Sequence, residues 1–311
     1  MQSAFKPLLL SFTICLFSLA LPAQIFDKTK GKNVQKLYNQ PVHVYTYGKG
    51  AYHERLAAAF NTYWKVTAFE LHDYSKGLQP MPSGSSVFMP AVVGLTVRDH
   101  ATSMNHPFYV FGESTASGSV YGNGIVTAFP INGFHYELDV TADSLFNRSL
   151  LRVPYIVQTM NEMLTHLKTN GSDDGYFKMV DARSSRISKK TMLIPAELLK
   201  EWDVNPNTTA LMKANLDAGK KSMKPIMAAV MEESAISYSG KYKIMSTADI
   251  IKLEQSAEAE NYTLFLPAIN DKKYMMVFDL KTRELLYYET TSMGMKIKSK
   301  DFDKLNKAMG L

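Results

Sequence analysis

Three polar residues on one predicted strand carry the groups best suited to chemistry in this sequence. Residues 134–140 alternate between apolar and polar side chains, which predicts a half-buried β-strand. The polar face of this strand carries His135, Glu137 and Asp139. Imidazole and carboxylate groups are common ligands of divalent transition metals, so this face could contribute to a metal site.

Two histidines on other predicted strands could complete such a site. His43 lies in the first predicted strand, and His72 ends the second, two residues after Glu70. Alternate residues on one strand are about 7 Å apart, so a single strand cannot surround an ion. If the strands are neighbours, His43, His72 and His135 converge and a metal site forms. The same pattern also suits a solvated polar sheet surface, and the sequence leaves both interpretations open.

A catalytic nucleophile has little support in the sequence. Residues 112–116 (GESTA) approach the G-x-S-x-G elbow of hydrolases, but Ala116 replaces the second glycine. A segment rich in Gly and Ser follows, whereas the elbow needs a helix that exposes the serine. The sequence also contains no H-E-x-x-H motif. We therefore expect a protein that binds rather than catalyses.

The first residues have the pattern of a secretory signal peptide. Lys6 precedes an apolar run over residues 8–21, which is shorter than the roughly 20 apolar residues of a membrane span. Ala23 offers a small residue before a cut that leaves Gln24 first. We expect residues 1–23 to be removed, which makes the mature protein periplasmic or secreted and leaves it without a transmembrane segment.

The junction between Ala23 and Gln24 resembles the export signals common in Bacteroidota, and this resemblance implies an exported protein. It covers only the signal segment and points to no functional family. Cys15 is the only cysteine and lies within the apolar run, so it leaves with the signal. The mature chain therefore has no thiol for a disulfide or for a cysteine-ligated metal.

Length and charge narrow the classes of partner. The 311 residues are 46% hydrophobic, which is enough for a sizeable core in two domains. The formal net charge is +6, but the basic pairs along the chain stay apart and form no run. Because proteins that bind nucleic acids cluster their positive charge, we expect no nucleic-acid partner.

Two stretches of the sequence resemble each other. The matching segments are residues 64–67, 86–91 and 108–111 in the first copy, and 242–245, 263–268 and 274–278 in the second. The middle pair reads SVFMPA and TLFLPA. After the Pro-Ala pair, the next strand begins at residue 108 in the first copy and at residue 274 in the second. The first copy therefore carries an insertion of about 11 residues, a length that costs little in a surface loop.

Strand and helix patterns recur in the same order in both halves. We predict an α+β protein with two similarly ordered domains, each a mixed β-sheet with helices packed on one face, consistent with an internal duplication. The predicted segments are a signal peptide over 1–23, a flexible lead-in over 24–40, a first domain over 41–170, a linker over 171–190 and a second domain over 191–311. This element order resembles that of small envelope domains such as the N-terminal domain of the Tol-system propeller protein, and it carries over no functional residue.

Two helical patterns bear on this organisation. An apolar stripe over residues 146–167 predicts a long helix that either kinks at Pro154 or begins there. Residues 197–234 are predicted to be helical with interruptions near Pro206 and Pro225.

Three functions remain open from the sequence. The first is a non-enzymatic exported or cell-envelope protein that binds another protein or an envelope polymer. The second is an exported metal-dependent hydrolase that uses the His/Glu/Asp strand face, and a metal is the only cofactor that the sequence suggests. The third is a small-ligand-binding protein with its site in the cleft between the two domains. Because the first copy alone carries the insertion and the strand face, we expect any specific site to lie in residues 41–170.

Overall fold

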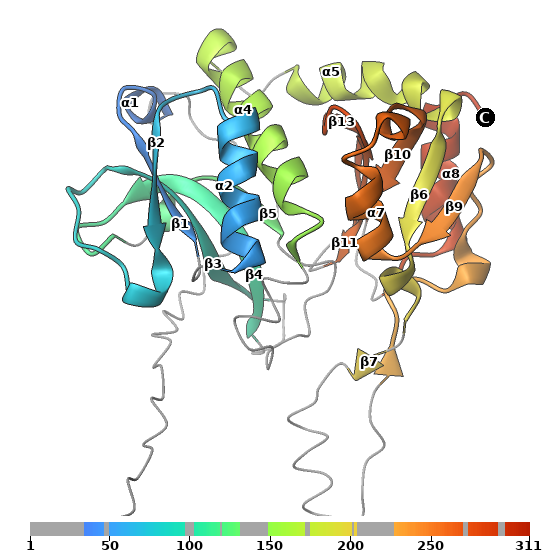
Figure 1. The fold of residues 1–311 in the computed structure, drawn as a ribbon, viewed down its shortest axis with the longest axis horizontal. Coiled ribbons are helices and arrows are strands. Elements are labelled where there is room, and N and C mark those ends of the chain that lie inside the picture. The colour runs from blue at the N-terminus through green and yellow to red at the C-terminus, as the bar shows by residue number, and fades with distance from the viewer. Residues whose placement is uncertain are drawn as a thin grey trace, which may run out of the picture.

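The protein is an α+β fold with two large mixed β-sheets, and Figure 1 shows the computed structural model. This arrangement confirms the predicted fold class. The structure describes residues 34–46, 50–96, 103–118, 120–130, 149–171, 175–200, 202–203, 227–269, 273–291 and 296–311.

The first sheet, sheet A, is five-stranded with the order β2-β1-β3-β4-β5. Its strands are β1 (Val42–Thr46), β2 (Phe69–Asp73), β3 (Ser86–Thr96), β4 (Ser103–Ser114) and β5 (Val120–Pro130). β1 lies between β2 and β3 and runs parallel to both, while β4 and β5 continue the sheet as antiparallel neighbours. The helix α2 (Ala51–Tyr63) connects β1 to β2, as a parallel pair requires.

The second sheet, sheet B, is six-stranded with the order β11-β12-β10-β6-β9, and β13 also pairs with β12. Its strands are β6 (Thr191–Pro195), β9 (Tyr242–Met245), β10 (Tyr262–Phe265), β11 (Ala268–Ile269), β12 (Lys273–Asp279) and β13 (Leu285–Thr291). β6 runs parallel to β9 and β10, and β12 is antiparallel to β10 and β13.

The two sheets share strand order and register. The strands β1 to β5 of sheet A correspond in turn to β6, β9, β10, β12 and β13 of sheet B. Ala91 of SVFMPA pairs with Phe108, and Ala268 of TLFLPA pairs with Tyr274. The pairs 86–91 with 263–268 and 108–111 with 274–278 therefore occupy the same places in the two sheets. The third pair of the predicted repeat is wrong, because residues 242–245 form β9 whereas residues 64–67 precede β2 and form no strand. Beyond Ala91 the pairing of β3 with β4 continues to Thr96 and Ser103, so the insertion of the first copy lengthens this hairpin.

The longest helix begins at its proline. α4 (Val153–Asn170) carries Pro154 in its first turn, where the missing N–H would have no partner in any case. The helix ends at Gly171, which adopts the left-handed conformation with φ of 70°. The other α-helices in the described residues are α1 (Val34–Leu37), α5 (Tyr176–Arg183), α7 (Thr247–Leu253) and α8 (Ser299–Ala308). Over the part of the chain that the structure describes, no helix is long and apolar enough to cross a membrane.

The described parts of residues 197–234 contain no α-helix, so the predicted long helix is wrong for them. These parts hold the 3-10 turns η3 (Ala196–Leu199) and η4 (Glu233–Ala235) and the short strands β7 (Trp202–Asp203) and β8 (Met227–Ala228). Leu198, Val230 and Met231 are buried against sheet B from this irregular chain, and the Met231 N–H donates to the Leu198 carbonyl. Their apolar character reflects this burial and not a helical face.

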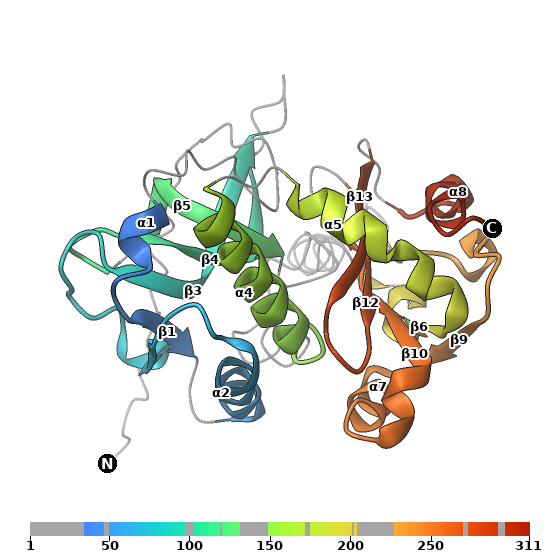
Figure 2. The ribbon, with the colours of Figure 1, turned by 90° about the horizontal axis from the view of Figure 1, so that it is seen from above.

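The elements stack in layers, with α2 and α4 between the two sheets and α8 on the far side of sheet B (Figure 2). One hydrophobic core joins the facing sides of sheets A and B through α4. α4 contacts both halves, because the Tyr155 ring lies 5.1 Å from the Phe278 ring and Asn161 accepts a hydrogen bond from the Lys65 N–H. A second core lies between sheet B and α8.

The outer face of sheet A has a small apolar cluster of its own. Tyr45, Val87 and Val110 are fully buried there. Side chains from the connection between β2 and β3 cover them, among them Tyr74, Leu78 and Met81. This connection thus covers the outer face of sheet A, whereas helices cover the corresponding face of sheet B.

A buried ionic cluster fastens the two halves together. Glu254, at the end of α7, pairs with Arg55 of α2 and lies 3.8 Å from the Arg283 guanidinium. The Tyr155 hydroxyl donates to the same carboxylate at 2.7 Å. Residues 171–190, predicted as a linker, hold α5 and the 3-10 segment η2 (Ser184–Lys189), which places regular structure at the predicted boundary.

Candidate functional site

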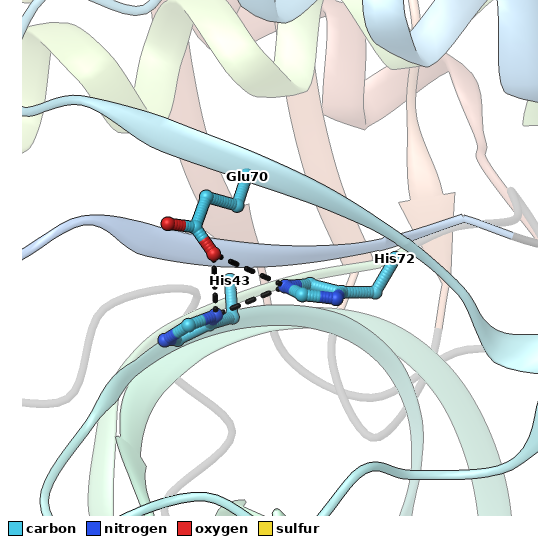
Figure 3. Close-up of side chains that lie close together, drawn as sticks. All are labelled: His43, Glu70 and His72. Carbon is cyan, nitrogen blue, oxygen red and sulfur yellow. Dashed lines mark hydrogen bonds and ion pairs between the residues drawn. The ribbon is translucent and has the colours of Figure 1, made fainter.

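The parallel pairing of β1 with β2 brings three polar side chains to one place. His43 pairs with Glu70 and Tyr45 pairs with His72, so His43, Glu70 and His72 share the outer face of sheet A. Figure 3 shows the three side chains converging from the two neighbouring strands. In the sequence, His43 is far from Glu70 and His72. The register between β1 and β2 brings the three side chains together.

The three ligand atoms are spaced as a small metal ion requires. His43 Nδ1 lies 2.9 Å from His72 Nε2, and Glu70 Oε2 lies 3.6 Å from the former and 3.8 Å from the latter. A point equidistant from three atoms with these separations is about 2.0 Å from each, which matches Zn–N and Zn–O bond lengths. An ion slightly above this plane would therefore reach all three ligands with little rearrangement.

The site lies at the sheet edge and is open on one side. The Glu70 side chain is 57% exposed, whereas those of His43 and His72 are 23% and 19% exposed. The Tyr45 ring backs the His72 ring at 5.3 Å, and the Tyr45 hydroxyl in turn accepts a hydrogen bond from the Gln79 N–H. The imidazoles are thus held against the protein, and the carboxylate faces solvent.

The electrostatics favour the neutral, metal-binding form of His72. Burial and the nearby charge of His43 lower the pKa of His72 below its ordinary value, and Glu70 opposes them less strongly. His72 is therefore a neutral imidazole at neutral pH, and a neutral ring nitrogen is the form that binds a metal.

The equivalent positions in sheet B carry no such group. Val87 of SVFMPA pairs with His43, while Leu264 of TLFLPA pairs with Leu193, so Leu193 is the counterpart of His43. Leu193 in turn pairs with Lys243, which makes Lys243 and Met245 the counterparts of Glu70 and His72. Leu193 is fully buried in the shared core. The counterpart of His43 is thus a core residue, whereas the counterpart of Glu70, Lys243, is exposed and that of His72, Met245, is partly buried.

Only part of the predicted ligand set can be compared with the structure. His43 and His72 come together as the hypothesis of neighbouring strands required. Glu70 was missing from the predicted ligands, although the E-x-H spacing on a strand places both side chains on one face. His135, Glu137 and Asp139 lie outside the described residues, so their part in a site stays a prediction.

An open hollow of about 550 Å³ adjoins His72 at the ends of β1 and β2. Its lining residues come from α2, β2 and the connection that follows β2: His53, Glu54, Leu71, His72, Asp73, Lys76 and Gln79. The described residues between the halves form the shared core, and a cleft there stays a prediction.

No family model, curated protein or solved structure matches the chain. Two imidazoles and one carboxylate can hold a transition-metal ion and leave one position of a tetrahedral site open.

Proposed function

We propose that this chain is an exported, metal-binding protein of the cell envelope, with a divalent transition metal held by His43, Glu70 and His72. The single observation that carries the proposal is the spacing of the three ligand atoms, 2.9, 3.6 and 3.8 Å apart on two paired strands. The pattern of the first 23 residues supports export.

Zinc is the ion that this ligand set suits best. Imidazole nitrogens favour zinc, copper and nickel over magnesium and calcium, which prefer sites made of oxygen ligands alone. Two histidines with one carboxylate form a known zinc ligand set. Copper(II) competes for the same ligands, because it stands highest in the general order of affinities.

The open coordination position supports binding as the main role. A water molecule, or a donor group of an envelope protein or polymer, could occupy it. This position also favours metal-dependent hydrolysis as a second candidate, because catalytic zinc sites keep three protein ligands and one exchangeable water.

A zinc titration of the metal-free protein tests the proposal. We expect the wild type to bind zinc and the variants His43→Ala, His72→Ala and Glu70→Gln to bind it far more weakly by calorimetry. His166→Ala, a substitution on α4, serves as the control and should leave the affinity unchanged. Equal zinc affinity in all five proteins would remove these residues from the site. Zinc-dependent cleavage of generic ester or peptide substrates, lost in His43→Ala, would favour the hydrolase.

Export is tested separately by fractionating cells that make the full-length chain. We expect the protein outside the cytoplasm with Gln24 as its first residue by mass spectrometry. A cytoplasmic protein that retains Met1 would contradict the proposed location.

A further inference from the structure

We infer that Thr46 and His53 are positioning residues for the metal site, an inference that rests on the proposed function. Thr46 ends β1, and its hydroxyl donates a hydrogen bond of 3.2 Å to the backbone carbonyl of His72. The same hydroxyl oxygen lies 2.8 Å from Nδ1 of His53, in the first turns of α2. A chain of two hydrogen bonds therefore joins α2 to the strand that carries His72.

The direction of this chain follows from the number of protons available. A hydroxyl has one proton, and Thr46 uses it on the His72 carbonyl. The Thr46 oxygen must then accept from His53, so Nδ1 of His53 carries a proton. The Nδ1–H of His53 thus donates its hydrogen bond to the Thr46 hydroxyl oxygen.

The metal site depends on this tie because two of its three ligands come from an edge strand. β2 has β1 as its neighbour and lies at the end of sheet A. Strands at an edge open locally more readily than central strands, and opening would move Glu70 and His72 away from His43. The Thr46 hydroxyl holds the end of β2 next to His72 and so maintains the separation of the two imidazoles.

His53 acts through the sheet and not as a ligand. Thr46 shares its face of β1 with Val42 and Val44, which are buried in the core under α2. The three metal-ligating side chains lie on the opposite face. In sheet B, Ala196 follows Pro195 at the position that corresponds to Thr46, so the half without the site also lacks the hydroxyl.

Paired substitutions separate positioning from simple loss of structure. Thr46→Val removes the hydroxyl at constant shape, whereas Thr46→Ser keeps the hydroxyl. His53→Ala removes the donor, while the amide of His53→Asn can replace the Nδ1–H group. Zinc affinity is measured by competition with a chelator, and the cobalt(II) absorption spectrum reports the coordination geometry.

We expect Thr46→Val and His53→Ala each to weaken zinc binding by about 10-fold or less. This is the low end of the effect of losing a partner of the ligand side chain itself, because Thr46 bonds to the backbone of His72 and not to its ring. Thr46→Ser and His53→Asn should stay near the wild type. The double variant should be no weaker than either single one, because both substitutions break one chain. The cobalt(II) spectrum should broaden or shift in the weakened variants only.

Two results would overturn the positioning role and leave the proposed function intact. One is equal zinc affinity in Thr46→Val and Thr46→Ser. The other is a cobalt(II) spectrum in which His53→Ala lacks one nitrogen ligand, since His53 would then bind the metal itself. A wild type that binds no metal would instead overturn the proposed function.

Discussion

Sheets A and B have the same strand order and register but place different chemistry at the same position. His43, Glu70 and His72 lie in sheet A where sheet B has Leu193, Lys243 and Met245. In sheet B, Leu193 is buried within the shared core and Met245 packs partly buried against it, while Lys243 at the edge is exposed. In sheet A the connection after β2 covers the neighbouring residues and leaves the edge partly exposed.

The difference shows that the fold does not need a polar cluster at this position. An apolar residue serves sheet B there, because a helix covers it and burial of apolar area stabilises the core. Two histidines that approach each other to 2.9 Å bring no comparable hydrophobic gain to sheet A. Leu193 of sheet B is thus explained by packing, whereas the proposed metal binding would explain the polar residues of sheet A.

Glu254→Ala should produce the largest loss of stability, because it breaks the connection between the two halves. The Glu254 side chain is 1% exposed, and its removal leaves Arg55 and Arg283 without their buried counter-ion. We expect a loss of about 3–5 kcal/mol in the free energy of unfolding, measured with urea. Glu258→Gln, at an exposed position of the same segment, is the control. A loss below 1 kcal/mol, as is typical of surface pairs, would show that the cluster does not join the halves.

Leu193→Ala and His43→Ala compare the two halves at one equivalent position. Leu193 is fully buried, so we expect its truncation to cost about 2–5 kcal/mol of unfolding free energy. His43 is partly exposed, and its truncation should cost about 1 kcal/mol or less. Zinc affinity should fall in His43→Ala and stay unchanged in Leu193→Ala. Similar stability losses in both variants would contradict the division between core and site.

Asp279 and Glu113 form a second equivalent pair, since they face Thr263 and Ser86 across corresponding strands. Burial acts to raise the pKa of Asp279, but Lys190 and the N–H groups of Thr282 and Lys281 outweigh it, so the pKa lies below its ordinary value. We expect Asp279→Asn to lose about 1.5–3 kcal/mol at neutral pH, the range for hydrogen bonds to charged groups.

This stabilisation from Asp279 has a defined pH window. Because the folded pKa is the lower one, the contribution is complete above the unfolded pKa of about 4 and disappears as the pH falls through the folded value. The difference between wild type and Asp279→Asn, measured by urea unfolding at several pH values, should therefore shrink below about pH 4. Glu113→Gln, at the partly buried counterpart, is the control. A difference that stays constant down to pH 2 would exclude the carboxylate as its source.

The smallest effect concerns the cover over the outer face of sheet A. Gly118 has φ of 84°, and a Cβ there would lie 2.6 Å from the Gln79 carbonyl oxygen in the connection after β2. Gly84 has a similar φ of 87° with open space around it, so Gly84→Ala measures the backbone strain alone. We expect Gly118→Ala to lower the melting temperature more than Gly84→Ala does, by the equivalent of about 1 kcal/mol of unfolding free energy. Equal melting temperatures would mean that the connection does not pack on this turn.

The sequence alone predicts the architecture well, because two of the three pairs of repeated segments occupy equivalent strands. The pair SVFMPA and TLFLPA marks the third strand of both halves, and the predicted insertion is the longer hairpin of β3 and β4. Two features needed tertiary information. α4 is buried on both sides, so its apolar stripe did not reveal the second sheet. The segment near Val230 is apolar because it covers sheet B, and in the sequence such burial cannot be told from the apolar face of a helix.

The candidate site was predictable only in part. Residue types identify His43 and His72 as possible ligands, and strand alternation places Glu70 beside His72. Pairing of β1 with β2, and the register that sets His43 opposite Glu70, could not be read from either strand alone. The role inferred for Thr46 depends on a bond to a backbone carbonyl, for which side-chain patterns give no signal.

The most direct test replaces the residues of one half by those of the other. The triple variant His43→Leu, Glu70→Lys, His72→Met gives sheet A the residues that sheet B already uses at these positions. Zinc titration calorimetry, with thermal unfolding of the metal-free proteins as the check of folding, compares this variant with the wild type. We expect the wild type to bind one zinc ion and the folded variant to bind none. Equal zinc binding by the two folded proteins, or no zinc binding by the wild type, would contradict this expectation.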